Sequence, residues 1–280
     1  MRIEGARDRW TAALFGGASL MIMALPLLML VDVVGAGLPR LSWEFLYAPP
    51  MDAGRAGGIG PMIVSTLAIL AVCLCAALPI GLGCALYLAE CVPAGGRAAR
   101  ALGYSLDVLG GVPSIVFGLF GYRLFAIELG LGFSILSGGL TLACMVLPLL
   151  IRLSEEALRA TPPSYRQAAA ALGLSQGGFL RRVLVPAAAP GIAAALILSV
   201  GRALAESAAL LFTAGYVTRL PDSVFDSGRA LAVHIYDLSM NVAGGEGGAA
   251  TTAVVLVGLL VLINLCARRL GQALHRMQRA

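Results

Sequence analysis

The chain has 280 residues, of which 59% are hydrophobic and 12% are charged, and its formal net charge is +5. Soluble domains are about 45–50% apolar and about 25% charged, so this composition, with a mean hydropathy of +0.89, excludes a water-soluble globular protein. All 20 basic residues are Arg, and the absence of Lys excludes a Walker A phosphate loop and Schiff-base chemistry.

Six apolar segments follow one another along the chain, and each is long enough to cross a bilayer as a helix. A bilayer core about 30 Å thick needs about 20 apolar residues, and the period-2 alternation of a transmembrane barrel is missing. We therefore expect an all-α integral membrane protein with six transmembrane helices. The expected spans are roughly residues 11–37, 61–89, 104–126, 132–153, 190–216 and 249–267.

The Arg residues are distributed unequally between the two sides of these spans. Fourteen fall on the side that holds both termini, five fall on the other side, and one lies within a span. Because cytoplasmic loops carry the excess of basic residues, we expect a multi-pass membrane protein with both termini in the cytoplasm. The basic charge then needs no nucleic-acid partner.

The segment between the fourth and fifth spans, about residues 154–189, is polar and therefore expected in the cytoplasm. Pro162-Pro163 ends one helix, an Ala-rich stretch over 165–172 starts another, and Gly173 stands where a left-handed residue ends it. Such a small-sided helix can enter a partner's groove. The stretch is also compatible with a DNA-binding helix-turn-helix, although the flanking spans leave no further helix for such a domain. A solvated loop is the third interpretation.

Arg202 and Glu206 lie inside the fifth expected span, four residues apart and so on one helix face. Counted from Pro190, Arg202 lies about 18 Å into the membrane. A charge at that depth costs roughly 2.5–3.5 kcal/mol and marks a functional site by default. The pair is either part of an anion pathway, since guanidinium matches phosphate or carboxylate oxygens, or a structural clamp between helices.

Residues for enzyme chemistry are not arranged in a known pattern. His234 and His275 lie far apart, no H-E-x-x-H or G-x-S-x-G motif occurs, and the six Cys are expected to pack as free thiols. We predict a protein that is not an enzyme, with no catalytic residue, no metal site and no cofactor of its own.

Four stretches, in the same order, resemble the A-type permease subunits of phosphate-specific ABC importers. Gly111–Phe120 (GVPSIVFGLF) is similar to that family's GVPSIV-x-GLF element, and residues 155–186 resemble its EAA-x3-G coupling loop. Arg202–Ala214 looks like the family's RA-x-GETAPLLFTA, and residues 264–268 resemble its N-x-x-AR. The resemblance covers roughly residues 57–270.

The resemblance implies a type I ABC importer permease of the bacterial inner membrane that forms half of a translocation pathway. It implies a homologous C-type permease, a dimer of cytoplasmic ATPase subunits that bind the ATP, and an extracytoplasmic phosphate-binding protein as partners. It also implies an N-terminal segment over 1–56, a permease core over 57–270 and a basic cytoplasmic tail over 271–280. The implied site residues are Arg202, Glu206 and Ser207 in the substrate pathway, Arg166, Gln167, Ala168, Ala169 and Gly173 in ATPase coupling, and Gly111, Val112, Pro113 and Ser114 in a structural motif.

Several positions depart from the family pattern. Gln167 replaces the Glu of the coupling loop, which removes one charged contact to the ATPase, and the GETAP stretch is altered at Ala205, Ser207 and Ala209. Alternative functions are a permease for sulfate, molybdate or phosphonate, a secondary transporter, or a membrane-anchored DNA-binding regulator. No internal repeat of the kind found in secondary transporters is evident.

Overall fold

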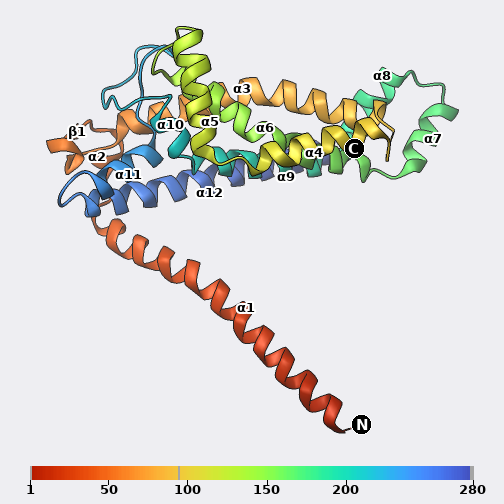
Figure 1. Cartoon of the computed structure of the whole chain (residues 1–280), viewed down its shortest axis with the longest axis horizontal. Coiled ribbons are helices and arrows are strands. Elements are labelled where there is room, and N and C mark those ends of the chain that lie inside the picture. The colour runs from red at the N-terminus through yellow and green to blue at the C-terminus, as the bar shows by residue number, and fades with distance from the viewer. Residues whose placement is uncertain (1, 94, 278–280) are drawn as a thin grey trace.

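The computed structural model describes residues 2–93 and 95–277, and it is mostly helical (Figure 1). Five helices are long and apolar enough to cross a membrane, and a sixth span is formed if one bent pair counts as a single crossing. The fold class expected from the sequence is therefore confirmed. The N-terminal elements are α1 (Arg2–Gly37), η1 (Leu38–Arg40), α2 (Trp43–Tyr47), β1 (Pro50–Met51), η2 (Asp52–Gly54) and β2 (Ala56–Gly57).

The core of the bundle is the contact between α3 (Gly60–Cys91) and α6 (Ile135–Arg159). Glycines allow the two helices to approach closely: a Cβ on Gly81 would lie 2.7 Å from Leu150 Cδ2, and one on Gly139 would lie 2.5 Å from Val72 Cβ. Small residues at helix contacts are the usual means of packing within a membrane. α9 (Val185–Leu204) and α12 (Glu246–Met277) complete the bundle beside them (Figure 1).

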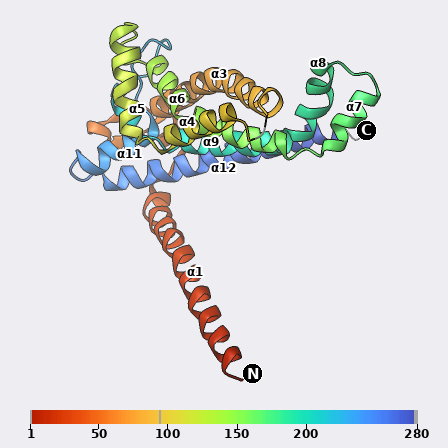
Figure 2. The same cartoon turned by 45° about the vertical axis from the view of Figure 1, so that its right-hand side comes forward.

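The third expected span, residues 104–126, is broken rather than continuous. α4 (Arg97–Gly111) ends at the GVPS motif, where the chain bends by 94°. Beyond the bend, α5 (Ser114–Gly121) runs directly into the π-helix η3 (Tyr122–Glu128). Pro113 lacks an N–H and disfavours helical geometry at the residue before it, and Val112 has the extended angles φ −65° and ψ 131°. Both views show the α5 segment running across the direction of the long helices rather than along it (Figures 1 and 2).

The fifth expected span, residues 190–216, also differs from the structure. It begins earlier, because α8 (Gln176–Phe179) and the π-helix η4 (Leu180–Leu184) run directly into α9, and it ends earlier, at Leu204. A turn at residues 205–207 separates α9 from the short helix α10 (Ala208–Leu211). Because of this break, Arg202 lies within α9 and Glu206 lies beyond its end.

The two ends of the bundle differ in structure (Figure 1). At one end, α7 (Pro163–Ala171) and α8 form the segment predicted to contact a partner, next to the end of α3. At the other end lie α2, the two-stranded antiparallel β1–β2 pair and α11 (Leu231–Met240). Residues 278–280 of the expected basic tail lie outside the described part of the chain.

α1 leaves the bundle at an angle, and Figures 1 and 2 show most of its length without a neighbour. None of its most apolar window is buried inside the chain. Its attachment is at its C-terminal end, where the Thr251 hydroxyl of α12 donates a hydrogen bond of 3.1 Å to the Gly37 carbonyl. A Cβ on Gly37 would lie 2.5 Å from the Ala250 carbonyl oxygen, so the two helices cross at backbone contact there.

Candidate functional site

Arg202 and Glu206 do not form the expected pair. Arg202 lies in the last turn of α9, whereas Glu206 lies beyond the C-terminal cap, Ala205. The Glu206 carboxylate instead accepts a hydrogen bond of 3.2 Å from the Ala209 N–H at the start of α10. A carboxylate is stabilised by the free N–H groups and positive dipole at a helix N-terminus. Within residues 2–93 and 95–277, Arg202 makes no hydrogen bond or ion pair.

Arg202 lines a cavity of ≈ 260 Å³ together with two other charged residues, Asp107 of α4 and Arg152 of α6. Nε of Arg152 lies 3.6 Å from Oδ1 of Asp107. The rest of the lining is apolar, and it includes Met145 and Pro148. The cavity is therefore lined by two guanidinium groups and one carboxylate. Of the two cations, Arg152 pairs with Asp107, and Arg202 has no carboxylate partner in the described chain.

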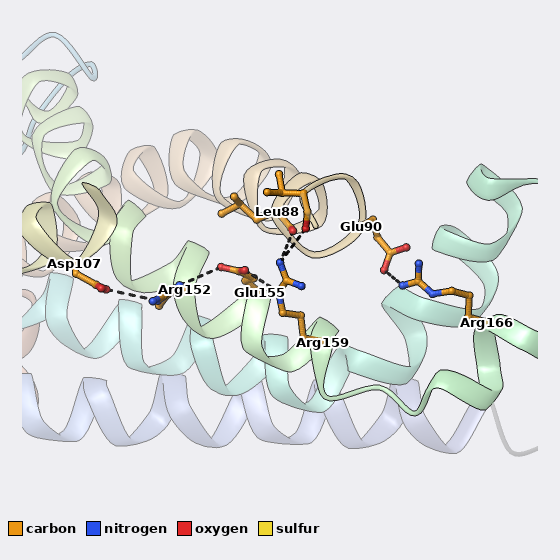
Figure 3. A network of polar contacts seen from close by, with 8 residues as sticks. Leu88, Glu90, Asp107, Arg152, Glu155, Arg159 and Arg166 are labelled. Atoms are coloured by element: carbon orange, nitrogen blue, oxygen red, sulfur yellow. Dashed lines mark hydrogen bonds and ion pairs between the residues drawn. The ribbon is translucent and has the colours of Figure 1, made fainter. Parts of the chain in front are cut away.

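Arg152 is also the start of a ladder of ion pairs along α6 (Figure 3). Its Nη1 lies 3.5 Å from Oε2 of Glu155, whose Oε1 lies 2.8 Å from Nε of Arg159. Arg159 then donates a hydrogen bond of 2.6 Å to the Leu88 carbonyl near the end of α3. Residues three and four apart share one face of a helix, and the Glu155 side chain, only 11% exposed, is neutralised by both arginines. A second cavity, of ≈ 440 Å³, lies along this ladder.

The helices around α7 start and end near the residues expected from the sequence. Pro163 occupies the first turn of α7, Gly173 has a φ of +67° just after the helix, and the Ser175 hydroxyl accepts a hydrogen bond of 3.2 Å from the Gly178 N–H at the start of α8. The positive φ explains why glycine is suited to position 173.

The five residues predicted for coupling lie on two different faces of this segment. Gln167, Ala168 and Gly173 are exposed. Ala169 is 4% exposed and packs among the chain's own apolar residues, in a cluster with Phe179 and Leu184. Arg166 forms an ion pair with Glu90 at the end of α3. Ala169 is thus covered by the chain itself, whereas Arg166 pairs with Glu90 and still leaves 58% of its side chain exposed. Contact with another protein is open to Gln167, Ala168 and Gly173.

The four residues of the predicted structural motif form the corner between α4 and α5. Val112 N–H donates to the Leu109 carbonyl at 3.2 Å, and Pro113 precedes the first residue of α5, Ser114. Beyond the corner, α5 lies directly on α10, because a Cβ on Gly118 would be 2.9 Å from Ala209 Cα. The motif therefore places α5 against the short helix that follows Glu206 and Ser207.

A polar cluster at the opposite end of the bundle was not predicted from the sequence. Nη1 of Arg229 lies 2.8 Å from Oδ2 of Asp237 and 3.4 Å from Nδ1 of His234, beside a cavity of ≈ 500 Å³. Burial, together with the neighbouring Arg229, lowers the pKa of His234 from 6.5 to about 4, against the opposing effect of Asp237. His234 is therefore neutral at pH 7.

Sequence reasoning also missed Asp107 and Arg152. Asp107 lies inside the expected span 104–126, and Arg152 lies at the end of the expected span 132–153, so a charge at membrane depth could have identified both. What the sequence did not supply was their proximity. Residues 107, 152 and 202 come together only through the packing of α4, α6 and α9.

Comparisons with known proteins agree on one family. Residues 77–279 match the family described as "Binding-protein-dependent transport system inner membrane component". The probable ABC transporter permease protein YqgI of Bacillus subtilis is 31% identical over 96% of this chain and 96% of its own length. The phosphate transport system permease protein PstA of Mycobacterium leprae is 33% identical over 93% of this chain and 88% of its own.

A solved structure with the same fold is a chain of a bacterial ABC transporter involved in the import of the acidic polysaccharide alginate. It has a TM-score of 0.61 and 13% identity, and the match covers 95% of this chain and 99% of that one. At this identity the likeness concerns the fold alone.

Proposed function

From the premise that this chain belongs to the family of binding-protein-dependent transport system inner membrane components, we propose that it is the A-type permease subunit of an ATP-driven phosphate importer. Membership makes it a multi-pass inner-membrane subunit of an ABC importer that is not itself catalytic. The phosphate cargo is the further step, and it is supported by the PstA relatives at about a third identity.

The observation that supports an anion cargo best is the cavity beside the end of α9. Its two guanidinium groups face one carboxylate, and Arg202 is the cation without an anionic partner in the described chain. Guanidinium presents a planar set of donors that matches the oxygens of phosphate. A single unpaired Arg lowers the cost of passing an anion without holding it tightly. In this proposal Arg202 meets the cargo, and Glu206 and Ser207 shape the turn that ends the helix beneath it.

The proposed coupling to an ATPase uses the outer face of α7. Gln167, Ala168 and Ala171 are exposed, and Ala171 follows the other two by four and three residues, so each of them neighbours Ala171 on the helix surface. Next to them Leu172 is 79% exposed, which leaves a large apolar side chain uncovered at the end of the molecule. A helix with small residues and one apolar anchor suits a groove on another protein.

The complete importer would contain a second, C-type permease, two copies of a cytoplasmic ATPase that bind and hydrolyse ATP, and an extracytoplasmic phosphate-binding protein. Both termini and α7 would face the cytoplasm, as the Arg distribution predicts. The N-terminal segment 1–56, the permease core 57–270 and the tail 271–280 are proposed to divide the chain. A DNA-binding role for α7 and α8 is disfavoured because Phe179 of α8 is buried against the membrane helices.

The proposal is tested by phosphate uptake in cells that lack other phosphate importers and carry all the partner subunits. Arg202→Ala should lower the initial uptake rate at least ~10-fold, because the pathway loses its free cation. Arg123→Ala is the matched control, since it removes a guanidinium that is 72% exposed at an ion pair with Glu128. Uptake by Arg202→Ala at the wild-type rate would contradict the pathway role.

The identity of the cargo is tested separately with the wild-type importer. Unlabelled phosphate should compete with labelled phosphate, whereas sulfate, molybdate and phosphonate in the same excess should not. Transport of one of these other oxyanions in the absence of phosphate transport would show that the substrate assignment is wrong, while the permease assignment would stand.

A further inference from the structure

Glu90, the second-last residue of α3, is a carboxylate that is almost completely buried. Its side chain is 4% exposed, and its one ion-pair partner among the described residues is Arg166 of α7, with Nη2 2.5 Å from Oε1. Figure 3 shows the two side chains directed toward each other across the gap between α3 and α7. Removing the partner of a buried charge is strongly destabilising. The contact therefore fixes the position of Arg166, 76 residues further along the chain.

Arg166 also joins a third element. Its Cζ lies 5.5 Å from the centroid of the Phe179 ring of α8, a cation–π distance. Phe179 is 7% exposed and packs in a cluster that includes Ala85 of α3, Leu158 of α6 and Ala188 of α9. One guanidinium thus connects α7 with α3 directly, and with α6 and α9 through an aromatic ring.

α7 has little else to hold it. It has nine residues, fewer than the 12–15 that a helix needs to be even marginally stable alone. Ala169 is its one buried residue, and it lies three residues after Arg166 on the inner face. The inner face of α7 therefore contacts the bundle through the Ala169 methyl group and the Arg166–Glu90 ion pair. Of these two contacts, the ion pair is the one that resists sliding of α7 along α3.

We infer that Glu90 and Arg166 are positioning residues that make α7 and the end of α3 move as one body. Movement that a docked ATPase imposes on α7 then passes into α3, and through the α3–α6 contact to the cavity that contains Arg202. The inference rests on the proposed function for the identity of the cargo. It also fits the neutral Gln167: the charge of Arg166, whose side chain is 58% exposed, is balanced by Glu90, and the exposed residues 167, 168 and 171 carry no charge, so docking depends mainly on shape.

The test measures phosphate transported per ATP hydrolysed in the complete importer reconstituted into vesicles. Glu90→Gln and Arg166→Gln should each lower this ratio at least ~5-fold while ATP hydrolysis continues, and the double variant should lose no more than either single variant. Arg166→Lys keeps the charge and should retain most of the ratio, which a purely structural defect would not predict. Glu128→Gln, the same change at an exposed ion pair, is the control and should keep the wild-type ratio.

A second measurement does not depend on the cargo. Spin labels at position 83 of α3 and position 171 of α7, both exposed, report the distance between the two helices with and without ATP. The distance should stay constant in the wild-type importer and widen on ATP binding in Glu90→Gln.

The outcomes separate this inference from the proposed function. Wild-type transport ratios in both Gln variants, or label distances that respond to ATP equally in wild type and Glu90→Gln, would overturn the inference. Failure of the wild-type importer to move phosphate would count against the proposed cargo only, and the label distances would then decide on the ion pair.

Discussion

At the scale of single residues, the charges of α6 are confined to its last turns. From Ile135 to Ile151 the helix carries no charged side chain, and Arg152, Glu155, Glu156 and Arg159 follow within eight residues. Three of these four pair with one another in register, so that the buried Glu155 is balanced by two arginines. The arrangement keeps the uncharged part of α6 for the bundle core and leaves Arg152 between two cavities.

His234 gives the chain a defined sensitivity to acid. Its pKa is lowered to about 4 in the folded protein, mainly by burial, so protons bind the unfolded state more readily between pH 6.5 and 4. Stability that is complete above pH 6.5 should be lost as the pH falls through this range, by about 2 kcal/mol at pH 5.

The measurement is the thermal midpoint of the purified chain in detergent from pH 7 to pH 5, compared with His234→Gln. Gln can still accept a hydrogen bond from Arg229 but has no proton to take up, so its midpoint should fall less over this range. An equal fall in both proteins would show that His234 does not set the acid sensitivity.

At the scale of elements, sequence patterns located the helices better than their breaks. The apolar runs identified α3, α6 and α12 because an uninterrupted hydrophobic segment has one stable form in a membrane. The bend at Val112-Pro113 and the turn at residues 205–207 were missed because a Pro or Gly in a membrane helix is tolerated as often as it ends the helix. The cavity around Arg202 could not be predicted, since it depends on three helices that meet at one of these breaks.

Two adjacent alanines of α7 offer a test of which face meets the ATPase. Ala168→Trp places a bulky side chain on the exposed face, so it should reduce co-purification of the ATPase and leave the thermal midpoint of the chain unchanged. Ala169→Trp overpacks the buried cluster around Phe179, which typically costs about 1–3 kcal/mol, and so should lower the midpoint. Normal ATPase co-purification by Ala168→Trp would contradict docking through this face.

At the scale of the whole molecule, the bundle is stabilised without α1. The buried residues form clusters among α3 to α12, and α1 touches the rest chiefly near Gly37. Replacing residues 10–36 with an unrelated Leu–Ala helix of equal length should therefore leave the thermal midpoint of the bundle within about 5 °C of the wild type. A larger fall would show that α1 is part of the folded core, against the proposed division at residue 57.

The length of α1 has a consequence for the surrounding lipid. The span Trp10–Arg40, which comprises α1 from Trp10 onward together with η1, has 31 residues, which at about 1.5 Å each is roughly 46 Å, well beyond a hydrocarbon thickness of about 30 Å. Such hydrophobic mismatch is relieved by tilting, kinking or local thickening of the bilayer, and the helix diverges from its neighbours (Figure 2). A thicker membrane, rich in long acyl chains, would let α1 lie closer to the bilayer normal. Bilayer thickness therefore affects the position of the N-terminal end of α1 relative to the bundle.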